Sequence, residues 1–332
     1  MSENTQWIVA GAPHIHGPES VKKMMWGVVI ALIPAFLVSI YFFGLQALCV
    51  IGVSVASCIL FEWLIQRFFF HKPLSIGDGS AVITGLLLAF NLPSNLPLGI
   101  VVIGALVAIG IAKMAYGGLG NNPFNPALVG RAFLLISFPV AMTTWPLIHP
   151  LLGEQIVTDA ITGPTPLSFA KESLKMGIPV QEIMTQIGSY SQMAMGQKGG
   201  SLGELSAIAI LLGGLYMLFR KIISWHIPVS FLGSAFLFAT ILWWTDPSTY
   251  FPPVFVLLSG GLMLGAIFMA TDLVTSPITP WGKIVFGIGC GVLTILIRVF
   301  GSYPEGVSFA ILIMNAFVPL INKGFSPKRY GY

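Results

Sequence analysis

Residues 98–112 read Leu98-Gly99-Ile100-Val101-Val102-Ile103-Gly104-Ala105-Leu106-Val107-Ala108-Ile109-Gly110-Ile111-Ala112, a run without a polar side chain. An apolar helix of roughly 20 residues crosses a hydrocarbon core of about 30 Å. With its flanks this run predicts a helix over about 97–114, and other apolar runs of roughly 17 to 22 residues occur along the chain. The chain is therefore predicted to be an all-α integral membrane protein.

The composition agrees with a membrane location and excludes several other classes. Of 332 residues, 55% are hydrophobic and 8% are charged, against about 25% charged residues in a typical soluble domain. The net charge of +4 is small, so no nucleic-acid partner is expected. Cys49, Cys58 and Cys290 lie in apolar runs without a Cys-x-x-Cys pair. Since a cluster usually needs about four thiolates, neither an iron–sulfur cluster nor a disulfide framework is expected.

Polar, proline and glycine breaks divide the apolar sequence into ten predicted membrane segments. They are expected at about 24–43, 45–67, 80–92, 97–114, 126–142, 203–221, 226–244, 253–270, 281–300 and 305–321. Pro34 is expected to kink the first segment. The third segment is too short to cross the bilayer as a straight helix, so interrupted helices are expected.

The two halves of the chain resemble each other weakly. Lys22–Phe43 aligns with Gly203–Ser224, and Leu98–Gly117 aligns with Trp281–Gly301. Five segments per copy is an odd number, so the second copy must run inverted, as in many transport folds. The predicted organisation is a tail at 1–20, a five-helix repeat at 21–142, a loop at 143–202, a second five-helix repeat at 203–322 and a tail at 323–332.

Lysine and arginine positions predict the orientation, because short cytoplasmic loops are enriched in both. With the N-terminus inside, eleven of these residues fall inside and four outside. Both termini are then cytoplasmic and the loop at 143–202 is extracytoplasmic. The outside set is Lys171, Lys175, Lys198 and Arg298.

The loop at 143–202 contains Asp159-Ala160-Ile161-Thr162-Gly163-Pro164-Thr165-Pro166-Leu167-Ser168. Pro166 disfavours the α region for Thr165, and Pro164 and Pro166 have fixed φ angles. We expect the Thr165 hydroxyl to be exposed on a stiff, extended loop, which suits covalent modification. The alternative is a plain proline-rich turn. A charged, helix-like piece follows at Phe169–Met176.

Two further polar stretches interrupt apolar segments. In Asn121-Asn122-Pro123-Phe124-Asn125-Pro126-Ala127-Leu128-Val129-Gly130-Arg131, Asn125 can cap the fifth segment and Pro126 suits its first position. Arg131 then lies inside the membrane, where a cation is costly and usually functional. A flavin phosphate, a carboxylate or backbone carbonyls could bind it, or it could reach the interface as a snorkelling side chain.

The other stretch is Met269-Ala270-Thr271-Asp272-Leu273-Val274-Thr275-Ser276-Pro277. Asp272 and Thr275 could bind a cation or the edge of a flavin ring, or they could simply cap a helix end. Of the remaining acids, Glu62 is expected at the membrane interface and Asp78 is expected to cap the helix that starts at Ser80.

These stretches, in this order, resemble the RnfD/NqrB family of membrane subunits, found in the Rnf ferredoxin:NAD oxidoreductase and the sodium-pumping NADH:quinone reductase. The family motif is roughly Asp-x-x-Ser/Thr-Gly-Ala-Thr-Pro-Leu, and Pro164 stands here in place of its alanine. The matching residues are Asp159, Thr162, Gly163, Thr165, Pro166 and Leu167. The residues around Arg131 resemble the family's Asn-Pro-Ala-x-x-Gly-Arg element. In the family a phosphoester joins FMN to the last motif threonine, which the resemblance assigns to Thr165.

The resemblance, with short tails closer to RnfD, implies a subunit of an ion-translocating electron transport complex in a bacterial or archaeal inner membrane. Covalent FMN would pass electrons between subunits, coupled to Na⁺ or H⁺ movement. Implied partners are other membrane subunits, a second flavoprotein subunit, iron–sulfur and NAD-binding subunits, and a flavin transferase for maturation. A second, noncovalent flavin such as riboflavin occurs in the NqrB branch. The sequence has no Gly-x-Gly-x-x-Gly before a helix and no Walker motif, so no NAD or ATP site is expected in this chain.

Three alternatives stay open at this point. Inverted repeats and the intramembrane Arg131 would equally suit a secondary transporter without a redox role. The chain could also be an NqrB-type subunit, or a scaffold subunit that binds no cofactor. Flavin absorbance separates a flavoprotein from a transporter.

Overall fold

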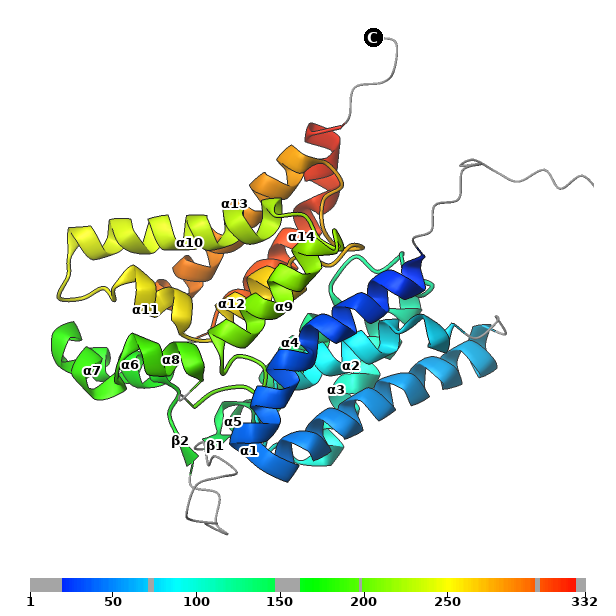
Figure 1. The fold of residues 1–332 in the computed structure, drawn as a ribbon, viewed down its shortest axis with the longest axis horizontal. Helices are drawn as coiled ribbons and strands as arrows, with labels where there is room; N and C mark the ends of the chain where they lie inside the picture. Colours follow the sequence, from blue (N-terminus) through cyan, green and yellow to red (C-terminus); the bar gives the residue numbers. More distant parts are fainter. Residues whose placement is uncertain (1–19, 71–74, 147–161, 197–198, 302–304, 327–332) are drawn as a thin grey trace, which may run out of the picture.

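The computed structural model describes residues 20–70, 75–146, 162–196, 199–301 and 305–326. The described residues are mostly helical (Figure 1). The helices are α1 Val21–Ile65, α2 Ser80–Phe90, α3 Leu98–Leu106, α4 Pro126–Ser137, α5 Pro139–Thr143, α6 Pro166–Lys175, α7 Val180–Ile187, α8 Tyr190–Met195, α9 Ala207–Phe219, α10 His226–Thr245, α11 Pro253–Leu258, α12 Leu262–Leu264, α13 Pro280–Phe300 and α14 Val307–Gly324. The π- and 3₁₀-helical turns are η1 Gln66–Phe70, η2 Ile76–Asp78, η3 Val107–Ile111, η4 Met114–Tyr116 and η5 Gly265–Met269. The strands β1 Trp145–Pro146 and β2 Thr162–Gly163 pair antiparallel.

The first element is a helical hairpin. Within α1 only Gly44 leaves helical dihedral angles, with φ 60° and ψ −139°, a conformation that glycine adopts without strain. Figure 1 shows the chain reversing there, so that α1 consists of two antiparallel legs. This confirms the predicted separation of segments 24–43 and 45–67. Pro34 lies within the first leg without leaving helical dihedral angles, so the kink expected there stays a prediction.

Several membrane segments are interrupted, and each interruption has a local cause. The predicted 80–92 segment is the short α2, as expected. The predicted 126–142 segment divides at Phe138 because Pro139 cannot continue the hydrogen-bond ladder of α4. The predicted 253–270 segment divides into α11, α12 and η5 around Gly260, whose φ is 63°.

The loop at 143–202 is more structured than the sequence predicts. Besides the expected helix near 169–176, which is α6, it contains α7 and α8. A small core of its own, with Ala170, Ile183 and Met193, packs on Phe255 of α11. The apolar residues responsible are too few to give an evident period, so the sequence alone predicted a single helix. Helices α6–α8 lie on the left in Figure 1, near the C-terminal end of α10.

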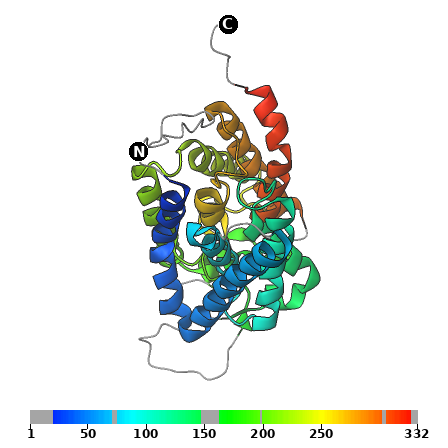
Figure 2. The same cartoon turned by 90° about the vertical axis from the view of Figure 1, so that its right-hand side faces the viewer.

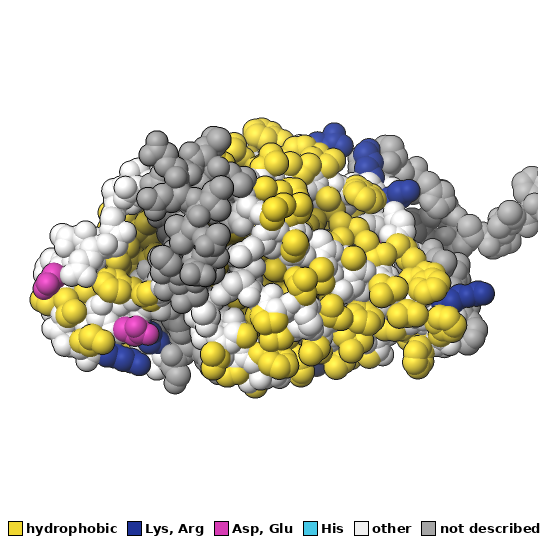
Figure 3. Space-filling view, turned by 90° about the horizontal axis from the view of Figure 1, so that it is seen from below, with side chains coloured by type: hydrophobic (Ala, Val, Ile, Leu, Met, Phe, Trp, Pro, Cys, Tyr) yellow, Lys and Arg dark blue, Asp and Glu magenta, His cyan; other side chains and the backbone are white. Residues whose placement is uncertain are grey.

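The outer surface has the character of a membrane protein. In the described part of the chain, five helices are long and apolar enough to cross a bilayer: Val21–Phe70, Leu98–Tyr116, His226–Thr245, Pro280–Phe300 and Val307–Gly324. Shorter apolar helices are Ser80–Phe90, Pro126–Ser137 and Ala207–Phe219. Figure 3 shows a broad hydrophobic belt, with charged side chains gathered toward its left and right ends. The start of α1 and the end of α14 lie on the same side of the molecule (Figure 2).

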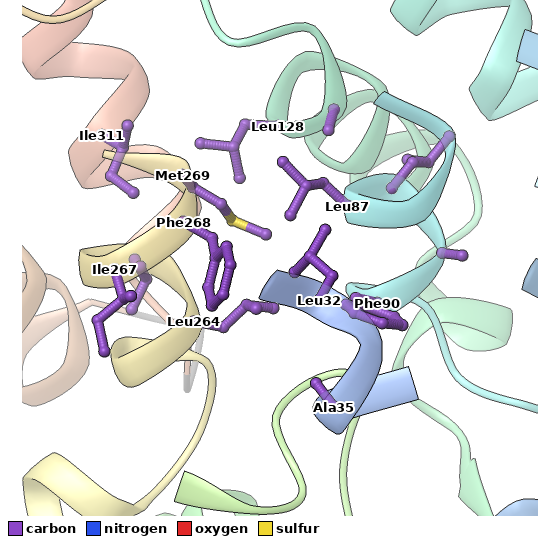
Figure 4. Close-up of a cluster of buried hydrophobic side chains, with 14 of the residues drawn as sticks. Leu32, Ala35, Leu87, Phe90, Leu128, Leu264, Ile267, Phe268, Met269 and Ile311 are labelled. Carbon is purple, nitrogen blue, oxygen red and sulfur yellow. The ribbon is translucent and has the colours of Figure 1, made fainter. Parts of the chain in front are cut away.

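The two halves of the chain share one apolar core. Leu32, Leu87 and Leu128 come from α1, α2 and α4, and Phe268 and Ile311 come from η5 and α14. Figure 4 shows these side chains converging between the ribbons of the two halves. The halves are therefore packed together as one body, and polar groups buried at this contact must find partners across it.

Candidate functional site

Two predicted site residues line one small cavity between the halves. This cavity, called here the Lys113 cavity, has a volume of about 80 Å³. Its polar lining comes from both halves: Ser80, Thr84, Lys113, Asn122, Asn125, Thr271 and Asp272. Leu87, Met217 and Phe268 form part of its apolar wall. Asn125 and Asp272, which are far apart in the sequence, thus line the same cavity.

Lys113 is buried beside this cavity and pairs with a buried acid. Its Nζ donates to Glu62 Oε2 at 2.6 Å and to Ser80 Oγ at 2.7 Å. The other Glu62 oxygen accepts from Gln66 Nε2 at 3.2 Å. Glu62 is 1% exposed and thus buried within the protein, while its predicted level at the membrane interface stays a prediction. Burying two charges is tolerable only when both are paired and hydrogen-bonded, as they are here.

Asp78 caps the start of α2, as predicted. Its Oδ1 accepts from the Ser80 amide and from Ser80 Oγ, both at 2.7 Å. Ser80 therefore links Asp78 to the Lys113 ammonium. The result is a continuous hydrogen-bonded chain from the α2 start to the residues that follow α3 and η3.

Asn125 has the predicted capping role and a further one. Its Oδ1 accepts from the amides of Ala127 and Leu128, and Pro126 occupies the first turn of α4. Its Nδ2 also donates to the Met269 carbonyl at 3.2 Å. The cap of α4 is thereby tied to the end of η5 in the other half of the chain.

Arg131 lies in the contact between the halves. Its side chain is buried and forms an ion pair with Glu305, just before α14. Its Nη1 donates to Asn91 Oδ1 at 2.9 Å. Of the partners considered from the sequence, a carboxylate is the one found, and the snorkelling alternative is wrong because Arg131 is 4% exposed.

Asp272 and Thr275 form a hydrogen-bonded turn after η5. Asp272 accepts from the Val274 amide at 3.3 Å and from Thr275 Oγ1 at 3.0 Å. Neither residue caps the next helix, because Thr279 caps α13. Asn315 of α14 donates to the Thr275 carbonyl and accepts from the Asn125 amide, both at 3.2 Å in the amide orientation that satisfies its neighbours. Asn315 thus joins the two predicted stretches.

Thr165 lies apart from this cavity, at the start of α6. Its φ of −65° and ψ of 156° are extended, as the flanking prolines predict. Its Oγ1 accepts from the Ser168 amide at 3.1 Å and lies 2.9 Å from Ser168 Oγ. The predicted exposure is wrong: Thr165 is 3% exposed, because its hydroxyl caps the helix instead of pointing to solvent.

The other motif residues add little to this geometry. Gly163 belongs to β2, which pairs with β1. Thr162 also belongs to β2, and only its backbone is described. Asp159 lies outside the described residues. The motif around Thr165 and the residues around Asn125 and Asp272 are therefore two separate candidate sites.

Sequence reasoning missed several buried charged residues. Lys113 and Arg298 were counted only as topological charges, and Glu305 was not singled out. Arg298, near the end of α13, is 6% exposed and donates to the carbonyls of Val256 at 2.7 Å and Ser259 at 3.0 Å. A usable signal existed, since Glu62, Lys113 and Arg298 are charges inside or next to apolar runs.

The fold and these buried charged groups define a helical integral membrane protein. Its two halves contact each other partly through buried polar and charged side chains. The chain belongs to the NQR2, RnfD, RnfE family, which it matches over residues 8–331. This confirms the family predicted from the three motifs.

Individual relatives cover nearly the whole chain. The chain is 44% identical over 324 residues to a subunit of the proton-translocating ferredoxin:NAD(+) oxidoreductase complex of Clostridium ljungdahlii, covering 97% of this chain and 96% of the relative. It is 43% identical to a subunit of the Na(+)-translocating ferredoxin:NAD(+) oxidoreductase complex of Acetobacterium woodii, covering 97% and 95%. It is 40% identical to a subunit of the ion-translocating oxidoreductase complex of Yersinia enterocolitica, covering 98% of both chains.

Proposed function

We propose that this chain is the RnfD-type membrane subunit of an ion-translocating ferredoxin:NAD oxidoreductase complex in a bacterial inner membrane. The main support is the full-length similarity to relatives that are named as subunits of such complexes. Relatives named for H⁺ and for Na⁺ are almost equally similar, so the proposal includes both ions. Its partners would be the other membrane, flavoprotein and iron–sulfur subunits of the complex.

Within this role, Thr165 would carry FMN through a phosphoester at its side-chain oxygen. The support from this chain is the position of Thr165 as the N-cap of α6, a helix of 10 residues. Amide groups and the positive end of the helix dipole favour a phosphate at such a position. The flavin would supply the redox chemistry, and this chain would hold its phosphate beside the α6 amides. A flavin transferase would form the bond.

A second, noncovalent flavin fits less well. The Lys113 cavity has the hydrogen-bonding groups that a flavin ring edge requires, including Asn125 and Asp272. Its volume of about 80 Å³ is far below the roughly 300 Å³ at which small-molecule sites begin. A cavity of this volume is too small for riboflavin.

The proposed membrane arrangement is ten segments in two inverted repeats, with both termini cytoplasmic and residues 143–202 outside. The two legs of α1 and the interrupted α11–α12–η5 segment support the division into segments. Buried cations also occur at matching places in the two halves: Lys113 lies four residues before Gly117, and Arg298 lies three before its aligned Gly301. An inversion puts these cations at opposite faces of the membrane.

The test is flavin fluorescence of the denatured subunit, made together with a working flavin transferase. Thr165→Ala should abolish the fluorescence, and Thr165→Ser should retain part of it. Thr185→Ala, which changes an exposed threonine of the neighbouring α7, should leave it unchanged. Peptide mass should assign the adduct to Thr165. Fluorescence that persists in Thr165→Ala, or an adduct on Thr162, would refute the attachment site.

The same measurement separates the proposal from its alternatives. A secondary transporter or a cofactor-free scaffold predicts a colourless wild-type subunit. Electron flow through the assembled complex should fall in Thr165→Ala, whereas a scaffold role predicts no change. The presence of flavin in the wild type together with loss of electron flow in the variant supports the redox role.

A further inference from the structure

A second and larger cavity lies where α6 packs against the helices of the second half. This Arg298 cavity has a volume of about 300 Å³, the lower end of the range for small-molecule sites. Its lining comes from α6, the ends of α10, α11 and α13, and the loop that joins α10 to α11. It is independent of the Lys113 cavity and shares no residue with it.

Cationic side chains from two elements line this cavity. Lys171 and Lys175 come from α6, and Arg298 comes from α13. Lys171 Nζ donates to the Arg298 carbonyl at 3.2 Å, which holds the two walls together. Burial lowers the pKa of Lys171, and the nearby charge of Lys175 lowers it further. Among the described residues that line the cavity none is Asp or Glu. Glu305 and Glu204 lie near Arg298 and offset its charge. Lys171 and Lys175 are therefore the cations that favour an anionic occupant.

The rest of the lining is apolar and aromatic. Leu174, Phe251, Phe255 and Val299 belong to it. These side chains suit hydrocarbon, while the cations suit an anionic group. The cavity therefore has the chemistry of a site for a molecule with an anionic head and an apolar tail.

The position of the cavity matches the level of lipid headgroups. It includes Leu242 near the end of α10. On the same helix Leu237, Ile241 and Trp244 are 63%, 56% and 74% exposed, as expected for a lipid-facing surface. Tryptophan at a helix end is typical of the membrane–water interface. These exposed residues are expected to face acyl chains, and the lining near the end of α10 is then expected close to lipid phosphates.

We propose that the Arg298 cavity binds an anionic phospholipid from the leaflet that contains α6–α8, with its phosphate at Lys171 and Lys175 and an acyl chain against Phe251 and Val299. Basic pockets between membrane helices bind anionic headgroups on the cytoplasmic side of membranes, and the same charge complementarity applies in the opposite leaflet. A bound lipid would fasten α6, and with it the residues that follow Thr165, to α10 and α13.

A flavin attached to Thr165 is the rival occupant, and the charges argue against it. Lys171 and Lys175 follow Thr165 by six and ten residues, or about 9 and 15 Å along a helix. A phosphate bonded to Thr165 stays at the start of α6, far from Lys175. Since the oxidised flavin ring is uncharged, it would not in that state supply the anionic group that these cations favour.

The test uses the assembled complex in nanodiscs containing a photoreactive phosphatidylglycerol, or a phosphatidylcholine with the same acyl chains. Crosslinked peptides should map to 237–256 and 292–301 with phosphatidylglycerol. The double variant Lys171→Gln/Lys175→Gln should reduce this labelling about tenfold, to the level seen with phosphatidylcholine. Lys175→Gln alone changes an exposed residue and keeps the hydrogen bond from Lys171 to the Arg298 carbonyl. It should reduce phosphatidylglycerol labelling about threefold.

Two controls complete the test. Lys323→Gln changes an exposed lysine near the end of α14 and should not alter labelling. Thr165→Ala, which removes the attachment oxygen, should not alter it either, whether or not FMN is attached there in the wild type. Equal labelling by both lipids, or unchanged labelling in Lys175→Gln, would overturn the proposal. Labelling that rises several-fold in Thr165→Ala would also overturn it, because the flavin would then be the occupant.

Discussion

Arg131 of α4 and Glu305, which precedes α14, form a buried ion pair across 174 residues of sequence. The pair joins a helix of the first half to the last helix of the second half. Asn91, at the end of α2, accepts a further hydrogen bond from the same guanidinium. Three separate segments are thus held at one point inside the apolar core.

This pair predicts a strongly non-additive mutational response. Arg131→Leu and Glu305→Gln each leave one buried charge without its partner, which typically costs about 3–5 kcal/mol. The double variant Arg131→Leu/Glu305→Gln removes both charges and should be less destabilised than the sum of these two single variants. Thermal unfolding of the purified subunit measures this. The unfolding temperature of Arg131→Lys should lie between those of the wild type and Arg131→Leu. Lysine keeps the charge but cannot contact Glu305 and Asn91 at the same time, as the guanidinium does. Additive effects would show that the pair is not coupled.

The packing of α9 on α1 predicts a specific glycine requirement. A Cβ at Gly213 would lie 2.1 Å from the Ala31 carbonyl oxygen, which belongs to the backbone and cannot rotate away. Gly213→Ala should therefore force the helices apart and cost about 1–3 kcal/mol. Gly233→Ala on α10 is the matched control, since nothing lies within 4 Å of its Cβ, and alanine favours the helix. Equal unfolding temperatures for the two variants would contradict this contact.

The orientation is tested by cysteine labelling of intact cells. Lys175→Cys, in an exposed position on α6, should react with an impermeant thiol reagent added outside. Lys323→Cys should react only in inverted vesicles. Cys49 is exposed and must first be replaced by serine, whereas Cys58 and Cys290 are buried. Removing the buried Lys113 and Arg298 from the topological count leaves ten basic residues inside against three outside, so the expected orientation stands. The reverse labelling pattern would put Thr165 on the cytoplasmic side.

The burial of Thr165 predicts that the order of maturation matters. With Thr165 3% exposed and its hydroxyl engaged by Ser168, a folded subunit offers little for a transferase to reach. Transferase added to purified flavin-free subunit should attach FMN much more slowly than transferase present during synthesis. Ser168→Ala removes the hydroxyl beside Thr165 Oγ1 and should speed the late reaction. In-gel fluorescence against time measures both rates, and equal rates before and after folding would contradict the buried position.

Local features of the sequence were enough to predict most helix positions. The α10, α13 and α14 bounds agree with the predicted segments within a few residues, because a long apolar run is a strong local signal. The break between the first two segments, which the structure has at Gly44, was also predicted. Helices α7 and α8 were missed, because they are short and are stabilised by contacts with α6 and Phe255.

Several site features followed from the sequence for the same reason. The cap of α4 by Asn125 and the extended backbone of Thr165 depend only on residues next to them in the chain. The three motifs also determined the family, which the full-length match confirms. The attachment of FMN to Thr165 remains a prediction.

The sequence by itself determined the membrane class, the order of the helices and the family, because apolar run length, caps and motifs are encoded by neighbouring residues. Only the tertiary structure decided which charges meet. Lys113 forms an ion pair with Glu62, and Arg131 forms one with Glu305. Arg298 donates hydrogen bonds to carbonyls at the end of α11. A buried charge must be paired to be tolerated, but its partner is chosen by how the helices pack, and helix packing joins residues that are far apart in the chain.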